Sequence, residues 1–362
     1  MKLPIKIVFS AALIAAVVLG CTVPAAAADH YLIADQFNNR VIEVDHRGNV
    51  VWHFGLGPSD FSPASIIGVN DAQRVGEFTL MAGTGTPGGQ PEAPNCTNSS
   101  GCPDNRVILV DHAGNIVWQY GTFGPGGSGP NQLNTPVQNT WLPNRHVLIT
   151  DQANQRIIEV DVATNMIVWQ YGTTGVSGNG PNQLNNPNCA ELLSNGNVLI
   201  CDENNNRAFE VTPTPPLGGN IVWQYGSGDP TINDPVSGVA FASRLKNGHT
   251  LITDSNHSRI VEIDRNSNVV WEYFTCTGAD CNLPRGTGPL PTRAVRMRHG
   301  HTLISDQYNH RVIEVNHAKH IVHTWGKLDS LGYNAENVAD GGLNSPYDAK
   351  AVGDSTGLTA PF

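Results

Sequence analysis

The sequence contains few charged and few aromatic residues, and beyond its first twenty residues it contains no long apolar run. Charged residues make up 14% of the 362-residue chain and aromatic residues 7%. With 40% hydrophobic residues, the chain is too apolar to be disordered, and no helical membrane span is expected. Helical periodicity is also missing, whereas 38 glycines and 24 prolines punctuate the chain. This balance is typical of a protein built from many short strands.

Sequence motifs of several enzyme and metal classes are absent as well. There is no G-x-S-x-G, no phosphate loop ending in lysine and no H-E-x-x-H. Because C-x-x-C pairs are also lacking, no metal site is predicted. The net charge of −10 would repel phosphate backbones, so nucleic acid is not an expected partner. No cofactor is predicted, with a channel-bound divalent ion such as calcium left as an alternative.

Residues 1–28 are predicted to be a secretory signal peptide. Lys2 and Lys6 precede an apolar run over residues 7–20, which is too short for a membrane span and typical of a signal sequence. The small residues 25–28 provide the cleavage site that we favour, and a lipobox ending at Cys21 is the alternative. We therefore expect a periplasmic or extracellular protein, with a lipid anchor at Cys21 as the second option.

The six cysteines that follow the signal peptide are an even set, which in an exported protein favours disulfides. Two close pairs lie in loops rich in Gly, Asn and Pro, and we predict that both are bonded: Cys96 with Cys102, and Cys276 with Cys281. Cys189 and Cys201 flank a predicted hairpin. Whether they also pair is left open.

An internal repeat dominates the rest of the chain. A unit that reads D-x-x-x-x-R, then E-V, then V-W-x-Y-G recurs nearly intact over residues 32–55, 147–172, 198–226, 250–274 and 302–326. A sixth, diverged copy is interrupted by an insert at about 83–104. The motif aspartates Asp151, Asp202, Asp254 and Asp306 are spaced by 51, 52 and 52 residues. Because each unit also carries four strand patterns separated by turns, it corresponds to one blade of a β-propeller.

The two ends of the mature chain predict how the ring closes. A strand at residues 31–35 matches the second strand of a blade, and a strand at 347–352 follows Pro346 without partners of its own. Pairing these two strands removes two exposed sheet edges. We therefore predict an all-β, six-bladed propeller with four antiparallel strands per blade, in which the C-terminal strand supplies the inner strand of the first blade. It is expected to be one domain over residues 29–362, and a monomer.

Residues 187–211 resemble the NHL repeat. They contain P-x-x-x-A, N-G-N-V-L-I-C-D, N-N-N-R and F-E-V, and the G-P-N-Q-L-N at 129–134 and 180–185 is similar to the lead-in of that repeat. The phrases N-G-H-T-L-I-T-D and V-V-W-E-Y also resemble bacterial arylsulfotransferase propellers. The resemblance implies the fold, whereas NHL propellers serve as binding modules, lyases and extracellular sensors. The channel histidines of the related enzymes have no counterpart in the predicted innermost strands.

The repeated charged and aromatic residues are predicted to be structural. An Asp–Arg pair that recurs at the turn between the second and third strands of the blades is better explained by folding than by one active site. We expect its carboxylate to accept backbone N–H groups of that turn and its arginine to pair across the turn. Six tryptophans are expected to pack between blades near the outer strands: Trp52, Trp118, Trp169, Trp223, Trp271 and Trp325.

Functional residues are expected where the innermost strands line the central channel. Two residues after each lead-in proline stand Ser65, Gln138, Cys189, Ser237, Arg293 and Asp348. Four residues after it stand Ile67, Thr140, Glu191, Val239, Val295 and Lys350. We predict that Arg293 lies beside Asp348 and that Glu191 lies within reach of Lys350. The ligand-binding candidates are Ser65, Gln138, Ser237, Arg293, Asp348 and Lys350, with a merely water-filled channel as the alternative.

Together these features favour an exported binding or scaffolding propeller that holds a protein, a glycan or a small molecule. The alternative is a propeller enzyme, either a lyase, a hydrolase or a sulfotransferase-like protein. In that enzyme Arg293 would bind an anionic group, and Asp348 or Glu191 would act as acid or base. A third hypothesis, an assembly factor associated with the outer membrane, requires lipidation of Cys21.

Overall fold

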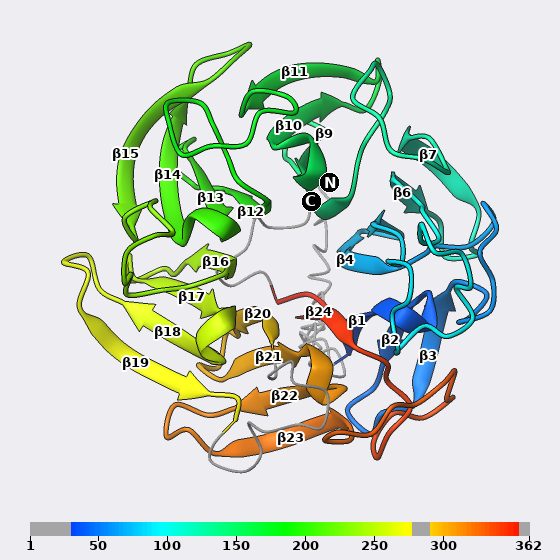
Figure 1. Cartoon of the computed structure of the whole chain (residues 1–362). Helices are drawn as coiled ribbons and strands as arrows, with labels where there is room; N and C mark the ends of the chain where they lie inside the picture. The colour runs from blue at the N-terminus through cyan, green and yellow to red at the C-terminus, as the bar shows by residue number, and fades with distance from the viewer. Residues whose placement is uncertain (1–29, 277–289, 355–362) are drawn as a thin grey trace, which may run out of the picture.

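The computed structural model describes residues 30–276 and 290–354, which form a ring of six four-stranded antiparallel sheets around a central axis (Figure 1). Each sheet is one blade, and we name its strands a to d from the channel outward. The structure confirms the predicted six-bladed, all-β propeller.

Blades 1 to 3 contain the first half of the strands. Blade 1 consists of β24 (Pro346–Ala351), β1 (Tyr31–Asp35), β2 (Arg40–Val44) and β3 (Val50–Phe54). Blade 2 consists of β4 (Val69–Val75), β5 (Phe78–Gly83), β6 (Arg106–Val110) and β7 (Ile116–Gly121). Blade 3 consists of β8 (Pro136–Trp141), β9 (His146–Asp151), β10 (Arg156–Asp161) and β11 (Met166–Tyr171).

Blades 4 to 6 repeat the arrangement. Blade 4 consists of β12 (Pro187–Leu192), β13 (Val198–Asp202), β14 (Arg207–Pro213) and β15 (Gly219–Tyr225). Blade 5 consists of β16 (Val239–Arg244), β17 (Thr250–Asp254), β18 (Arg259–Ile263) and β19 (Val269–Phe274). Blade 6 consists of β20 (Pro291–Arg296), β21 (Thr302–Asp306), β22 (Arg311–Val315) and β23 (Ile321–Gly326).

The ring closes in blade 1, as predicted. Strand β24 pairs antiparallel with β1, with Tyr31 opposite Ala351 and Ala34 opposite Asp348. Just beyond the strand, the N–H of Val352 donates to the carbonyl of His30 over 2.7 Å. Because β24 comes from the C-terminal end of the described chain, hydrogen bonds join the two ends and leave no gap in the ring.

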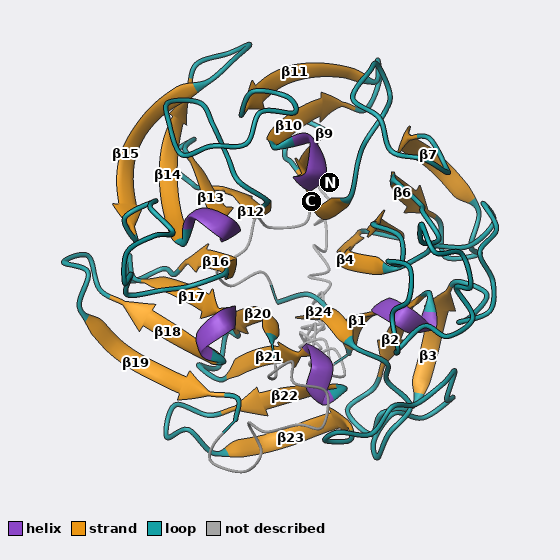
Figure 2. Ribbon diagram, viewed as in Figure 1, coloured by secondary structure: helices purple, strands orange, loops and turns teal. Residues whose placement is uncertain are grey.

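The b–c turns tie each blade to the start of its own inner strand. Five of these turns contain a one-turn 3-10 helix, drawn purple in Figure 2: η1 (Gln36–Asn38), η2 (Gln152–Asn154), η3 (Glu203–Asn205), η4 (Ser255–His257) and η6 (Gln307–Asn309). In blade 3, Asp151 pairs with Arg156 Nε over 2.7 Å across the turn and accepts the N–H of Asn134 over 2.7 Å. The arginine pairs as expected. The prediction that the carboxylate caps its own turn is wrong, because the N–H that it accepts lies in the lead-in to strand a.

The hydrophobic core is divided into six clusters, one at each junction between neighbouring blades. Strands b and c of one blade pack there against strands a and b of the next. The strand d tryptophans pack at these junctions, as expected, and the indole N–H groups of five of them donate to the next blade. Trp169 Nε1, for example, donates to the carbonyl of Gly218 over 2.9 Å.

Two disulfides are present in the described residues. Cys96 bonds to Cys102, which confirms one predicted pair, and Cys189 bonds to Cys201 on the opposing strands β12 and β13. The predicted partner of Cys276, Cys281, lies outside the described residues.

The segment 83–104 forms a loop over the face of the ring that carries the b–c turns. Its disulfide closes the loop near an isolated bridge between Thr86 and Cys102. The loop contacts blade 1 through Asn344 Nδ2, which donates to the carbonyl of Glu92 over 2.8 Å. Across residues 30–276 and 290–354, no helix is long and apolar enough to cross a membrane.

Candidate functional site

The structure corrects the predicted channel ring in two blades. Strands β4 and β16 begin at Val69 and Val239 rather than at Pro63 and Pro235, which lie in the preceding loops. Asp71 pairs opposite Ala82, and Phe241 pairs opposite Thr253. The third residues of the inner strands are therefore Asp71, Gln138, Cys189, Phe241, Arg293 and Asp348.

The two predicted ligand-binding serines are consequently not channel residues. Ser65 is fully buried and accepts the N–H of Leu56 through its hydroxyl over 2.9 Å. The backbone N–H of Ser237 donates to Asp254 over 2.7 Å, in the same way as the lead-in of blade 3. In blades 2 and 5 the proline lies several residues before strand a, because the preceding loops differ in length. Counting channel positions from the proline therefore gave the wrong residues in these two blades.

Four charged side chains from three blades form a compact cluster in the channel. Arg293 Nη2 lies 2.7 Å from Asp71 Oδ1, and Arg293 Nε lies 2.6 Å from Asp348 Oδ1. Lys350 Nζ lies 2.7 Å from the same Asp71 oxygen and also contacts Asp348. The Arg293 guanidinium lies over the ring of Phe241, 4.1 Å from its centroid. The structure thus brings the predicted residues Arg293, Asp348 and Lys350 together. With Asp71 they form a network of two carboxylates and two cations from the neighbouring blades 6, 1 and 2.

Burial and mutual attraction act in opposite directions on this cluster. Burial raises the pKa of Asp71, although Lys350 and Arg293 partly offset it. Burial also disfavours the charged form of Asp348, but Arg293 and Lys350 outweigh it and hold the pKa of Asp348 below its usual range. The cluster therefore has little charge left with which to bind a ligand, because each cation already faces carboxylates.

Several polar channel side chains also cap the exposed inner edge of the next blade. Asp348 accepts the N–H of Ala72 over 3.2 Å, and Asp71 accepts the N–H of Asn139 over 3.0 Å. Gln138 accepts the N–H of Ala190 over 3.0 Å. Strand a has no fifth strand inside it, so its inward backbone N–H groups need acceptors. These predicted site residues thus have an architectural role in the ring.

Residues from opposite blades meet at the channel mouth on the b–c turn face. Asn188 Nδ2 lies 3.0 Å from the hydroxyl of Tyr347 and donates to Glu203 Oε2 over 2.8 Å. Burial raises the pKa of Glu203 to about 7, against the opposing effect of the Asn188 hydrogen bond. Because Asn188 belongs to blade 4 and Tyr347 to blade 1, this contact spans the mouth.

Glu191 does not meet Lys350, contrary to the prediction. It lies on β12, across the ring from β24, and accepts the N–H of Arg244 over 3.2 Å. Burial raises its pKa well above the usual range, although Arg244 and Arg293 oppose the shift. Burial thus favours the protonated form of Glu191, and the residue belongs to a different site from the central cluster.

That site is a cavity of about 620 Å³ between blades 4 and 5, on the face that carries the a–b and c–d turns. We call it the blade 4–5 groove, and its walls are the turn segments 191–195 and 244–248 with Glu210, Trp223 and Arg265. Its volume lies within the range of small-ligand and peptide sites. A second cavity of about 450 Å³ lies between the insert and the loop that leads into β8.

The blade 4–5 groove combines apolar surface with three positively charged side chains. Arg244 lies 4.6 Å above the Trp223 ring and pairs with Glu210 over 3.0 Å. Its Nε atom is buried and has no hydrogen-bond partner among the described residues. Lys246 and Arg265 add two exposed cations at the rim. Sequence reasoning missed these residues, because only the folded ring brings the a–b turns of neighbouring blades together.

Solved structures that resemble this chain share its fold, and their sequences differ too much from it to indicate a shared activity. A protein of unknown function from Bacteroides caccae is 13% identical, with a TM-score of 0.53 over 82% of this chain and 93% of that one. Virginiamycin B lyase from Staphylococcus aureus is 14% identical, with a TM-score of 0.44 over 70% of this chain and 68% of that one. The likeness to the Bacteroides caccae protein shows the propeller fold alone.

No curated protein matches the chain. The predicted resemblance to NHL repeats is confirmed for the propeller fold, and the family model that matches the chain is a different one. This model covers residues 103–344, which is more than half of the sequence and includes blades 3 to 6. The chain therefore belongs to the propeller family described as outer membrane protein assembly factor BamB.

Proposed function

We propose that the protein is an exported binding and scaffolding propeller of the cell envelope that helps to assemble outer-membrane proteins. The observation that carries the proposal is the commitment of the polar channel residues to ion pairing and edge capping. A ligand at the channel centre would have to displace these contacts. Binding is therefore assigned to the faces of the ring, and the family description supports an assembly role.

The blade 4–5 groove is the proposed contact surface for a partner protein. Arg244, Lys246 and Arg265 offer positive charge beside Trp223 and Leu245. A partner segment with a carboxylate next to an apolar side chain fits this combination, since a cation beside an aromatic anchor is typical of strong interface positions. The predicted signal peptide and the two disulfides are consistent with an oxidising envelope compartment.

The test uses a strain of the source organism that lacks the gene. We expect lower amounts of assembled outer-membrane proteins in this strain, restored by the wild-type chain and not by the double variant Lys246→Glu with Arg265→Glu at equal protein level. Lys327→Glu, which reverses an exposed charge on the opposite face, is the control and should restore assembly. Normal outer-membrane protein levels without the gene would reject the assembly role.

An enzyme acting in the same groove is the second candidate, because Glu191 lies there beside Arg244 and burial raises the pKa of its carboxyl group. This alternative predicts that the purified chain converts a substrate and that Glu191→Gln abolishes turnover while leaving substrate binding intact. Equal turnover by the Glu191→Gln variant would exclude Glu191 as the acid.

A further inference from the structure

A His–Glu pair recurs on the face that carries the a–b and c–d turns. In four blades a histidine at the start of strand b approaches a glutamate on strand c through its Nδ1 atom. The distances are 2.6 Å for His30–Glu43, 2.6 Å for His146–Glu159, 2.7 Å for His249–Glu262 and 2.5 Å for His301–Glu314. In blade 4, Asn197 takes the place of the histidine and donates to Glu210 over 2.6 Å.

At three junctions an arginine from strand a of the next blade neutralises this glutamate. Arg244 pairs with Glu210 over 3.0 Å, Arg296 pairs with Glu262 over 2.9 Å, and Arg74 contacts Glu43. Each guanidinium also stacks on a strand d tryptophan, with Trp52, Trp223 and Trp271 within about 5 Å. A carboxylate held in this way has no room for a cation.

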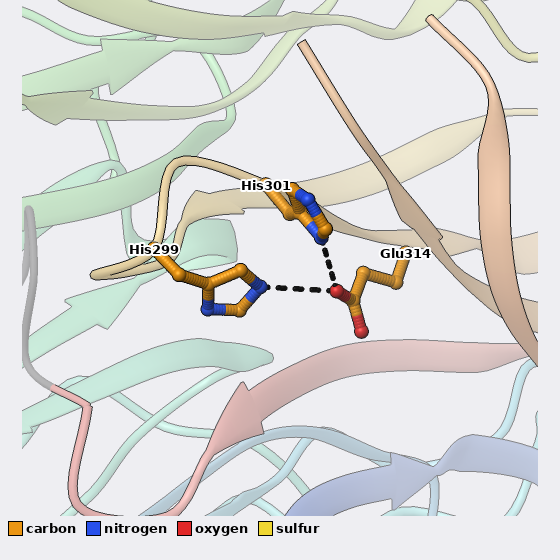
Figure 3. Close-up of side chains that lie close together, drawn as sticks. All are labelled: His299, His301 and Glu314. Atoms are coloured by element: carbon orange, nitrogen blue, oxygen red, sulfur yellow. Dashed lines mark hydrogen bonds and ion pairs between the residues drawn. The ribbon is translucent and has the colours of Figure 1, made fainter.

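The junction between blades 6 and 1 departs from the pattern at two positions. The residue of β24 that corresponds to the arginine is Ala351, which leaves Glu314 without a guanidinium. The a–b turn residue that is asparagine in blades 3, 4 and 5 (Asn144, Asn195 and Asn247) is here His299. Its Nε2 atom lies 3.1 Å from Glu314 Oε1, the oxygen that His301 also contacts (Figure 3).

The two changes together create a set of metal ligands. One ligand atom from each of His299, His301 and Glu314 lies within 4.8 Å of the others. Two imidazole nitrogens and one carboxylate oxygen are the ligands that zinc and neighbouring transition metals take in open sites. The His299 side chain is 52% exposed and that of Glu314 is 7% exposed, so the group opens to solvent on one side only.

Both imidazoles of the group face the same carboxylate, since His301 Nδ1 and His299 Nε2 both contact Glu314 Oε1. His323, which pairs opposite Glu314 on β23, stacks on His46 and adds a second pair of imidazoles behind the group.

We propose that His299, His301 and Glu314 bind one divalent transition-metal ion of the zinc class, with the remaining coordination position open to solvent. The blade 4–5 groove lies at a different junction of the same face, so the metal site is independent of the proposed function. The site exists because this junction combines two features: Ala351 stands at the arginine position, and His299 stands at the asparagine position of the turn.

The test measures metal binding to the mature, untagged chain after treatment with a chelator. We expect one Zn²⁺ per chain by calorimetry, and a visible absorption spectrum of Co²⁺ with nitrogen and oxygen ligands. His299→Asn inserts the residue that three other blades carry, and it should weaken Zn²⁺ binding by at least about 100-fold, since even the loss of a supporting residue costs 10- to 100-fold. Ala351→Arg, which introduces the arginine that three other junctions carry, should weaken binding comparably without removing a ligand.

His249→Ala is the control, because Arg296 occupies its glutamate, and it should leave Zn²⁺ affinity and stoichiometry unchanged. Equal urea midpoints for His299→Asn and the wild type would establish that the fold is intact. The proposal is overturned if the wild type binds no Zn²⁺, or if neither His299→Asn nor Ala351→Arg changes the affinity.

Discussion

Arg293 joins the inner strands of three blades through its charge. It is 3% exposed and faces Asp71 and Asp348, and its ring contact with Phe241 adds a fourth blade. A buried ion pair contributes little net stability compared with apolar residues, but removal of one partner leaves charges without compensation. The cluster is therefore more important for holding the inner strands in one arrangement than for the stability it adds.

Replacement of Arg293 by methionine should destabilise the protein by about 3–5 kcal/mol, because it leaves two buried carboxylates facing Lys350 alone. Urea unfolding at neutral pH measures the loss. Arg298→Met, on an exposed a–b turn, is the control and should change stability by less than about 1 kcal/mol. Similar small losses in both variants would show that the cluster is dispensable.

Glu203 should make the stability of the protein depend on pH. Its pKa in the folded state is about 7, above the ordinary value of 4.5, so the folded protein binds a proton more tightly than the unfolded chain. The stabilisation from this proton is complete below pH 4.5 and declines as the pH rises to about 7. Glu203→Gln removes this decline while keeping the acceptor for Asn188.

Unfolding free energies at about pH 5 and about pH 8 measure the effect. The wild type should lose more stability between these values than Glu203→Gln does. Equal losses in the two proteins would contradict the raised pKa of Glu203.

At the scale of the element, the b–c turn fixes the start of the inner strand. Asp151 bonds at once to Arg156, to Asn154 and to the N–H of Asn134. Asp35, Asp202 and Asp254 likewise accept a lead-in N–H. In the diverged blade 2, Asp104 stands two residues before Arg106 and accepts the N–H of Ile67 instead. Blade 2 therefore keeps the contact between the aspartate and the lead-in N–H although it lacks the D-x-x-x-x-R motif.

Asp151→Asn should cost about 3–5 kcal/mol, because Arg156 is buried and would lose its carboxylate. The variant keeps the shape of the side chain, so the loss reports on charge. Asp161→Asn, at an exposed c–d turn, should cost much less, because solvent screens the charge of this carboxylate. Thermal or urea unfolding of both variants tests the expectation, and equal costs would refute a special role for the b–c turn.

At the scale of the whole molecule, the closure of the ring depends on β24 as an inner strand and not on the order of the chain. The end of β24 lies next to the start of β1, since Val352 bonds to His30. A circular permutant that begins at Gly341, joins Asp354 to His30 by a short linker and ends at Asp340 should therefore fold with near-native stability.

A chain that stops at Asp340 is the comparison for this permutant. It exposes the edge of β1 and leaves Arg293 and Asp71 without Asp348 and Lys350, so we expect aggregation. Gel filtration and circular dichroism distinguish the two chains. A stable monomer of the truncated chain, or a permutant that fails to fold, would show that closure works differently.

The sequence by itself determined the fold, because each blade repeats the same local information. Turn residues, strand alternation and the Asp–Arg motif recur about every 52 residues, and the unpartnered strand near Pro346 fixed the number of blades. Three of the predicted channel residues, Arg293, Asp348 and Lys350, also meet as part of one cluster. The local sequence pattern was sufficient to predict a channel residue wherever that residue lies at a fixed number of positions after the lead-in proline.

Only the tertiary structure decided what those residues contact. Asp71 and Phe241 were missed because loops of variable length separate them from the proline signal, and Glu191 was paired with the wrong blade. The blade 4–5 groove and the His299, His301 and Glu314 group depend on contacts between residues of neighbouring strands or neighbouring blades. Such contacts are set by the geometry of the closed ring, in which the neighbours of a side chain come from segments that the sequence keeps apart.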